Sequence, residues 1–163
     1  MKVYHGSDLT IKKPDPFHSR RFKMDFGRGF YTTSSVEQAR KFTHSVFRKN
    51  LEQGIKTVSV YEFDIRAFSE LKVKDFQDNL DEWFDYVEQN RRSGQDNYAD
   101  YDILIGPVAD DQIQASFALY EDGIIDKNEA LKRLKLEIYK DQIVFKSSRS
   151  VDYLTFIRAM VVK

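Results

Sequence analysis

Residues 25–33 read Asp-Phe-Gly-Arg-Gly-Phe-Tyr-Thr-Thr, a glycine-flanked arginine followed by β-forming residues. Gly27 and Gly29 permit positive φ angles and a close approach of the backbone to a neighbour. Residues 30–33 predict a strand. This is not a dinucleotide-binding fingerprint, because the third glycine is absent and a strand follows in place of a helix. Tyr31, just past the turn, can present its ring face to a flat heterocycle; the alternative is a β-turn that feeds a core strand.

A second short motif, Tyr4-His5-Gly6-Ser7, ends the first predicted strand, at residues 2–5. The glycine turn exposes the imidazole ring beside bare backbone N–H and C=O groups. Such a junction suits a ligand that offers both hydroxyls and an amide. The alternative interpretation is an ordinary strand-ending turn with a hydrogen-bonded histidine.

The other elements follow from periodicity and capping signals. Ser34 and Ser35, with Glu37 and Gln38 three residues on, carry a capping-box signature, so a helix begins here. Its apolar face is predicted to hold Val36, Ala39, Phe42, Val46 and Phe47. Further strands are predicted at 57–65, 101–105 and 142–145, helices at 76–90, 110–121 and 126–138, and a helical turn plus a strand within 150–162. The strands are scattered among helices without regular βαβ alternation, so the fold class is α+β, in a single domain over residues 1–163.

Composition excludes several function classes. The 163 residues include 13 Phe and 9 Tyr, enough bulk for a full core. The absence of cysteine excludes disulfides, thiolate catalysis and cysteine-based metal sites. Three scattered histidines, His5, His18 and His44, do not predict a metal site. The sequence shows neither a signal peptide nor a run near the ~18 apolar residues of a membrane helix, so we expect a cytoplasmic protein.

The net charge is zero but unevenly placed. Residues 1–50 hold 11 Lys and Arg against 4 Asp and Glu, whereas residues 62–126 hold 17 acidic and 5 basic side chains. One interpretation is two solvated faces of opposite sign. The other is that the basic part attracts a phosphorylated ligand and the acidic part a basic partner.

Together, the His5-Gly6-Ser7 motif, the 27–33 motif and the capped helix resemble the poly-ADP-ribose-polymerase-type (diphtheria-toxin-like) branch of the ADP-ribosyltransferases. The fuller chain, with its later Asn-Arg-Arg at 90–92 and its 101–111 and 141–145 segments, resembles the bacterial family named domain of unknown function 3990, which is assigned to that superfamily. The resemblance implies an ADP-ribosyltransferase-like fold of split antiparallel β-sheets flanked by helices. It also implies NAD as a substrate.

That superfamily carries a His-Tyr-Glu triad on three strands, and the resemblance assigns roles here. His5 would hydrogen-bond the adenosine-side ribose, the Gly6 backbone would pair with the nicotinamide carboxamide, and Tyr31 would stack on the nicotinamide ring. The implied NAD-binding residues are His5, Gly6, Ser7, Arg28, Gly29 and Tyr31. Arg20, within a basic loop that includes His18, Arg21 and Lys23, is a candidate for the pyrophosphate, because a guanidinium offers a bidentate fork to phosphate. An ordinary solvated loop is an equally good interpretation.

The third triad position departs from the family pattern, because Gln142 or Asp141 stands where a glutamate is expected. The two are exclusive, since neighbours on a strand face opposite sides. Gln142 is favoured because an amide can still orient a ribose hydroxyl, while Asp141 suits a solvent-facing strand end. Cleavage of the nicotinamide–ribose bond passes through an oxocarbenium-like state. A carboxylate stabilises that state and helps to deprotonate an acceptor, whereas a neutral amide does both less well.

A third polar cluster follows the 76–90 helix. Arg91 is predicted to form a buried ion pair with the acids near 101–111, which include Asp102, Asp110 and Asp111, or Asp110 to assist the acceptor. The alternative is a structural cluster of salt bridges and helix caps.

The leading hypothesis is an NAD-dependent ADP-ribosyltransferase, or NAD glycohydrolase, that modifies a protein or nucleic-acid acceptor. It would be the toxin of a bacterial toxin–antitoxin system and have an antitoxin protein as partner. A second hypothesis is a catalytically degenerate NAD- or ADP-ribose-binding module that acts through a protein partner. A third is a nucleic-acid binder that uses the basic and aromatic residues of 11–49, although the acidic 62–126 section opposes a broad DNA footprint. No metal and no membrane is expected among the partners.

Overall fold

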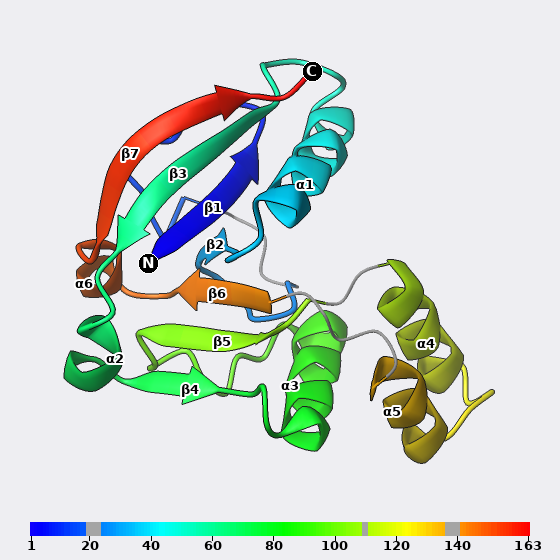
Figure 1. Ribbon diagram of the computed structural model, residues 1–163. Helices are drawn as coiled ribbons and strands as arrows, with labels where there is room; N and C mark the ends of the chain where they lie inside the picture. The colour runs from blue at the N-terminus through cyan, green and yellow to red at the C-terminus, as the bar shows by residue number, and fades with distance from the viewer. Residues whose placement is uncertain (19–23, 109–110, 136–140) are drawn as a thin grey trace.

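Seven strands form two separate sheets in the computed structural model, which describes residues 1–18, 24–108, 111–135 and 141–163 (Figure 1). The three-stranded sheet A has the order β1-β3-β7, made of Lys2–Ser7, Thr57–Phe63 and Leu154–Val161. The four-stranded sheet B has the order β2-β6-β5-β4, made of Phe30–Thr32, Asp141–Phe145, Ile103–Pro107 and Val73–Asp75. The expected α+β class, with two split sheets, agrees with this arrangement.

The prediction of purely antiparallel sheets is wrong at one pair. Strand β4 runs parallel to β5, whereas β1–β3, β3–β7, β2–β6 and β5–β6 are antiparallel. The chain leaves β4, passes through helix α3 (Leu80–Ser93) and returns as β5. Such a crossover through a helix brings the second strand back in the same direction as the first.

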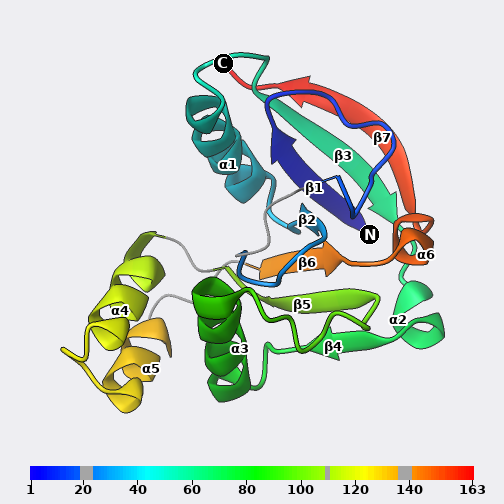
Figure 2. The same cartoon turned by 180° about the vertical axis from the view of Figure 1, so that it is seen from behind.

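Helices cover the outer surfaces of the sheets (Figures 1 and 2). Helix α1 (Val36–Lys49) lies on sheet A and α3 lies on sheet B, while α4 (Asp111–Glu121) and α5 (Lys127–Lys135) pair beside α3. Two single-turn helices, α2 (Ala67–Glu70) and α6 (Ser148–Val151), lie at the opposite end of sheet B. Among the helices of the described ranges, none is both long and apolar enough to cross a membrane.

Three apolar clusters hold these layers together. The first lies between the two sheets and includes Val3, Tyr61 and Phe63 from sheet A with Ile103 and Phe145 from sheet B. The second lies between sheet B and α3 to α5, and its members include Trp83, Phe84, Leu104, Phe117 and Val144. The third, smaller cluster lies between α1 and sheet A. Because sheet B is apolar on both faces, it is the central layer of the fold.

The two sheets are joined through their backbones at one point. The Tyr4 N–H donates to the Thr33 carbonyl at 2.9 Å, and the Thr33 N–H donates to the Tyr4 carbonyl at 3.0 Å. Strand β1 of sheet A therefore lies beside the end of β2 of sheet B.

Helix α1 confirms its predicted N-cap but not its whole predicted face. The Ser35 hydroxyl accepts a hydrogen bond from the Gln38 N–H. Phe42, predicted on the buried face, is 46% exposed, whereas Ala39 and Thr43 are buried. A Cβ on Gly6 would lie 2.2 Å from the Ala39 carbonyl oxygen and 3.2 Å from Thr43 Cγ2. Small side chains face the sheet because the helix backbone approaches β1 this closely.

Several predicted boundaries were wrong, among them the following three. Strand β1 continues to Ser7, because Gly6 and Ser7 still pair with Val58 and Thr57 of β3. Strand β5 includes Gly106 and Pro107, which pair with the start of β6. Helix α3 begins at Leu80 and not at residue 76, because the Asn79 side chain caps it by accepting from the Glu82 N–H.

Candidate functional site

His5 and Tyr31, far apart in the sequence, are brought together where β1 meets β2. The Nδ1 atom of His5 lies 2.6 Å from the Tyr31 carbonyl oxygen, and because a carbonyl can only accept, Nδ1 carries the proton. The ring stacks on Phe30 with centroids 4.4 Å apart. Burial lowers the pKa of His5 below its ordinary value. The ring is therefore neutral at pH 7, with Nε2 as an acceptor for a hydroxyl group.

Gly6 offers backbone groups at the same edge of β1. The N–H and C=O of Tyr4 point to β2, and those of Gly6, two residues further along the strand, point to the same side. The close approach of α1 also requires a glycine at this position, because a Cβ there would collide with the helix backbone. Gly6 lies within a strand and not in the predicted turn. The neighbouring Ser7 is buried, and its hydroxyl donates to the Asp8 carboxylate at 3.1 Å.

The hydroxyl of Tyr31 is held by the turn that precedes β2. Its Oη donates to the Gly27 carbonyl at 2.6 Å and accepts from the Phe26 N–H at 3.1 Å. Burial, with the nearby Asp25 carboxylate, raises the pKa of Tyr31 well above its ordinary value. The side chain is thus a neutral, half-buried phenol that packs at the margin of the core beside α3. Its ring position depends on the conformation of residues 26–27.

The two glycines of the motif make room for protein atoms. Gly27 has φ +66°, and a Cβ there would lie 2.3 Å from Asp96 Oδ2. A Cβ on Gly29 would lie 2.6 Å from Val144 Cγ1 of β6. Both positions therefore require glycine whether or not a ligand approaches.

Of the two predicted arginines, only Arg28 lies among the described residues. Arg28 is half-buried; its Nη2 donates to the Phe17 carbonyl at 2.5 Å, and its guanidinium carbon lies 5.3 Å from the Phe17 ring centroid. It thus contacts the loop between β1 and β2. Arg20, with Arg21 and Lys23, lies outside the described residues.

On β6, Gln142 shares a sheet face with Tyr31. Tyr31 pairs with Val144, and side chains two residues apart on a strand face the same way, so Gln142 lies on the Tyr31 side. Gln142 is 6% exposed, and its Nε2 donates to the Pro107 carbonyl at 2.9 Å. Asp141 faces the other side, where its Oδ1 accepts from the Thr33 hydroxyl and from both the N–H and the hydroxyl of Ser34. The carboxylate at this strand end ties β6 to the start of α1.

A buried ion pair behind Tyr31 was missed in the sequence. Lys146, 6% exposed, contacts the Asp96 carboxylate and donates to the Phe26 carbonyl at 2.7 Å. The Tyr86 hydroxyl donates to Asp96 Oδ1 at 2.6 Å. The available signal was period-two spacing from Gln142 and Val144, which places Lys146 on their buried face.

Of the acids predicted to pair with Arg91, Asp102 has another partner. The partner of Asp102 is Arg149, whose Nε and Nη2 donate to the two carboxylate oxygens at 2.8 and 2.5 Å. This bidentate contact lowers the pKa of Asp102 to about 2. Arg91 lies over the Phe117 ring instead, 5.0 Å from its centroid. Asp110 lies outside the described residues, as does the side chain of Asp111, so an ion pair of Arg91 with either of them and the predicted role of Asp110 stay predictions.

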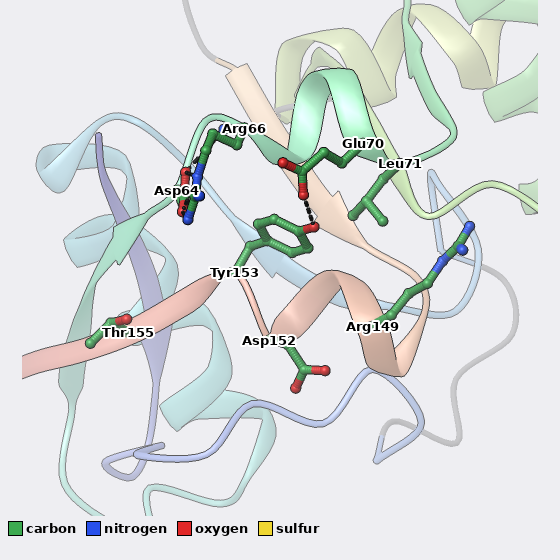
Figure 3. Close-up of a pocket in the computed structure, with 8 residues that line it drawn as sticks. All are labelled: Asp64, Arg66, Glu70, Leu71, Arg149, Asp152, Tyr153 and Thr155. Carbon is green, nitrogen blue, oxygen red and sulfur yellow. Dashed lines mark hydrogen bonds and ion pairs between the residues drawn. The ribbon is translucent and has the colours of Figure 1, made fainter.

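A groove of about 650 Å³ opens between α2, α6 and the start of β7 (Figure 3). Its lining residues are Asp64, Arg66, Glu70, Leu71, Arg149, Asp152, Tyr153 and Thr155. Figure 3 shows Arg66 lying against Asp64 and the Tyr153 hydroxyl directed at Glu70, both of which are hydrogen-bonded pairs. None of the predicted site residues that the structure describes lines this groove. Within the described ranges, no three His, Asp or Glu side chains are grouped to hold a metal ion.

Sequence comparison places the chain in a family. No curated protein matches it. The model of the family described as "Protein of unknown function (DUF3990)" matches residues 1–156, from β1 into β7. With nearly the whole fold inside that match, the chain belongs to the DUF3990 family.

Proposed function

We propose that this chain is an NAD-dependent ADP-ribosyltransferase that modifies a macromolecular acceptor. One observation carries the proposal: a neutral histidine, a glycine at a strand edge that pairs with no other strand of the described ranges, and a half-buried tyrosine meet at the junction of β1 and β2. The motifs that supply them are the ones that resemble the poly-ADP-ribose-polymerase-type branch of the superfamily. The junction would form one wall of the NAD cleft.

Each group matches a different part of NAD. The Nε2 atom of His5 accepts from a ribose hydroxyl, because its Nδ1 proton is engaged by the Tyr31 carbonyl. The Gly6 N–H and C=O pair with the carboxamide, whose acceptor oxygen and donor NH₂ group are bonded to the same carbon. The Tyr31 ring stacks on the nicotinamide. Arg28, and Arg20 beyond the described residues, supply positive charge for the pyrophosphate.

The reaction would break the bond between the nicotinamide nitrogen and ribose C1′. The bonding electrons leave with nicotinamide, a nucleophilic atom of the acceptor forms the new bond to C1′, and its proton is released to solvent. Gln142, on the Tyr31 face of β6, is the residue nearest in sequence pattern to the glutamate of the family triad. A neutral amide orients a hydroxyl but stabilises the oxocarbenium-like charge less than a carboxylate does. We therefore expect slow transfer.

A specific observation favours a second candidate, an NAD- or ADP-ribose-binding module without turnover. The Gln142 amide is buried and already donates to the Pro107 carbonyl. A side chain held in this way contributes structure without a charge for catalysis. Such a module would act through a protein partner.

NAD binding and transfer are tested separately. Isothermal calorimetry with the wild-type chain measures NAD binding, and Tyr31→Ala is expected to abolish it by removing the stacking ring. Tyr31→Phe, which keeps the ring, is the matched control and should retain measurable affinity. If the wild-type chain does not bind NAD, the transferase fails, and if it does not bind ADP-ribose either, the binding module fails as well.

Transfer is then tested with NAD labelled in its adenylate half and a bacterial lysate. Incorporation into protein or nucleic acid by the wild type, but not by Tyr31→Ala, supports the transferase and identifies its acceptor class. A bacterial growth assay on induced expression tests the toxin role, with co-expressed neighbouring genes as the source of an antitoxin. Binding without label transfer or nicotinamide release, in both the wild type and Gln142→Glu, supports the module instead.

A further inference from the structure

We infer that Lys146 and Asp96 are positioning residues for Tyr31: their buried ion pair fixes the turn at residues 26–27 and so holds the tyrosine ring in place for its ligand. The identity of that ligand as NAD rests on the proposed function. The positioning of the ring does not depend on that proposal, because the contacts that link Asp96 and Lys146 to Tyr31 all lie within the protein.

The pair is enclosed by hydrogen-bonding groups. The Lys146 side chain is 2% exposed and that of Asp96 is 16% exposed. Lys146 Nζ contacts Asp96 Oδ2 and donates to the Phe26 carbonyl, while Asp96 Oδ1 accepts from the Tyr86 hydroxyl at 2.6 Å and from the Tyr98 N–H at 3.1 Å. Two apolar side chains of similar volume often stabilise a core as well as a buried ion pair does. The charges are therefore better explained by the geometry they impose than by stability alone.

The backbone of Phe26 connects the ion pair to Tyr31, since its carbonyl contacts one and its N–H contacts the other. Its carbonyl accepts from Lys146, and its N–H donates to the Tyr31 hydroxyl at 3.1 Å. The next carbonyl, that of Gly27, accepts from the same hydroxyl at 2.6 Å. Movement of the Phe26 carbonyl away from Lys146 would therefore change both hydrogen bonds of the tyrosine hydroxyl.

The glycines of the motif lie close to this ion pair. A Cβ on Gly27 would lie 2.3 Å from Asp96 Oδ2 and 3.3 Å from Lys146 Nζ, and one on Gly29 would lie 3.6 Å from Lys146 Cγ. The turn thus packs its bare backbone on the ion pair. The Gly-Arg-Gly sequence and the distant Lys146 and Asp96 form one structural unit.

The first test observes Tyr31 directly, without NAD. In protein labelled with ring-¹³C tyrosine, the Tyr31 signals are assigned by their loss in Tyr31→Phe. We expect Lys146→Met and the nearly isosteric Asp96→Asn to shift and broaden them. The matched control is Asp102→Asn, which damages the other buried carboxylate pair of sheet B and should leave the Tyr31 signals in place. Unchanged Tyr31 signals in a folded Lys146→Met or Asp96→Asn protein would overturn the inference.

The second test measures NAD affinity in a double-mutant cycle. Lys146→Met should raise the NAD dissociation constant about tenfold or more, and Asp102→Asn less than about twofold. In a Tyr31→Phe background, Lys146→Met should have little further effect, because the hydroxyl through which it acts is gone. Equal losses in the two backgrounds would contradict the inference. If the wild-type chain binds no NAD, the proposed function fails, and the ring spectra alone decide the positioning role.

Discussion

Asp96 and Asp102, which both lie between α3 and β5, each anchor an ion pair, and each takes its cation from the segment that follows β6. The side chains of the first pair, Lys146 and Asp96, are 2% and 16% exposed. In the second pair, Asp102 is 4% exposed while Arg149 is 65% exposed. Both charges leave water in the first pair, whereas only the carboxylate does in the second.

The cation type follows from this difference. A lysine ammonium is a compact point charge that can be surrounded, here by Asp96 and the Phe26 carbonyl. An arginine fork binds both oxygens of Asp102 from one side and keeps the rest of its guanidinium hydrated. We call Lys146–Asp96 the dry pair and Arg149–Asp102 the wet pair. The dry pair contacts the turn that holds Tyr31, and the wet pair connects α6 to the start of β5. We therefore expect the free energy of each pair to depend on how much water both partners have lost.

The largest effect is expected from Lys146→Met. The substitution leaves the Asp96 carboxylate buried without its cation, which costs about 3–5 kcal/mol of the free energy of unfolding. Urea denaturation followed by circular dichroism measures the loss. Arg149→Met is the matched control, and its loss should be smaller because its guanidinium is mostly hydrated. Equal losses for the two substitutions would show that dehydration of the cation does not determine the free energy of these pairs.

A smaller effect is expected where the turn packs on the dry pair. Gly27 and Gly123 have similar φ angles, +66° and +70°, so alanine at either position costs roughly 1–2 kcal/mol in backbone strain. Nothing lies within 4 Å of a Cβ on Gly123, whereas a Cβ on Gly27 would meet the Asp96 carboxylate. Gly27→Ala should therefore cost about 1–3 kcal/mol more than Gly123→Ala, from overpacking. Thermal unfolding of the two variants measures this difference. Its absence would show that the Asp96 carboxylate moves away from the new Cβ at no cost in free energy.

Local signals predicted most elements of the fold. Ser35 at the start of α1 and the alternating apolar residues of β3 determine their elements through their own neighbours, so the sequence was sufficient there. The short β4 was missed because its three residues have little intrinsic pattern and pair only with the distant β5. The exposure of Phe42 was missed because it depends on how closely α1 approaches Gly6, a tertiary effect.

The sequence indicated the two motifs of the candidate site but not the ion pair that connects them to distant residues. Both motifs were apparent from their residue types, and the bridge between Tyr4 and Thr33 brings them together. The Lys146–Asp96 pair joins residues from separate loops, and a charged residue is usually exposed. Ligand contact at Gly29 stays a prediction, and the structure shows that Gly27 and Gly29 pack closely against Asp96 and Val144, which the local sequence does not indicate.

The wet pair is expected to respond to acid. The pKa of Asp102 is lowered to about 2 by Arg149, so its ionised form stabilises the fold above the ordinary carboxyl pKa, and this contribution is lost as the pH falls from about 5 toward 2. Because Arg149 is hydrated, we expect the loss to be about 1–2 kcal/mol. The free energy of unfolding is measured from pH 6 to pH 2 for the wild type and Asp102→Asn. The gap between their curves should close at low pH, and a constant gap would contradict the assignment.

The smallest effect is expected from Arg149→Lys, which keeps the charge and removes the fork. A lysine ammonium contacts one oxygen of Asp102 where the guanidinium contacts two. The Ser147 hydroxyl and the Lys72 N–H still donate to the carboxylate, at 2.6 and 2.9 Å. The free energy of unfolding should therefore fall by about 1 kcal/mol or less. Urea denaturation at low and high salt checks this value. A loss as large as that of Lys146→Met would mean that the bidentate geometry, and not the degree of dehydration, separates the two pairs.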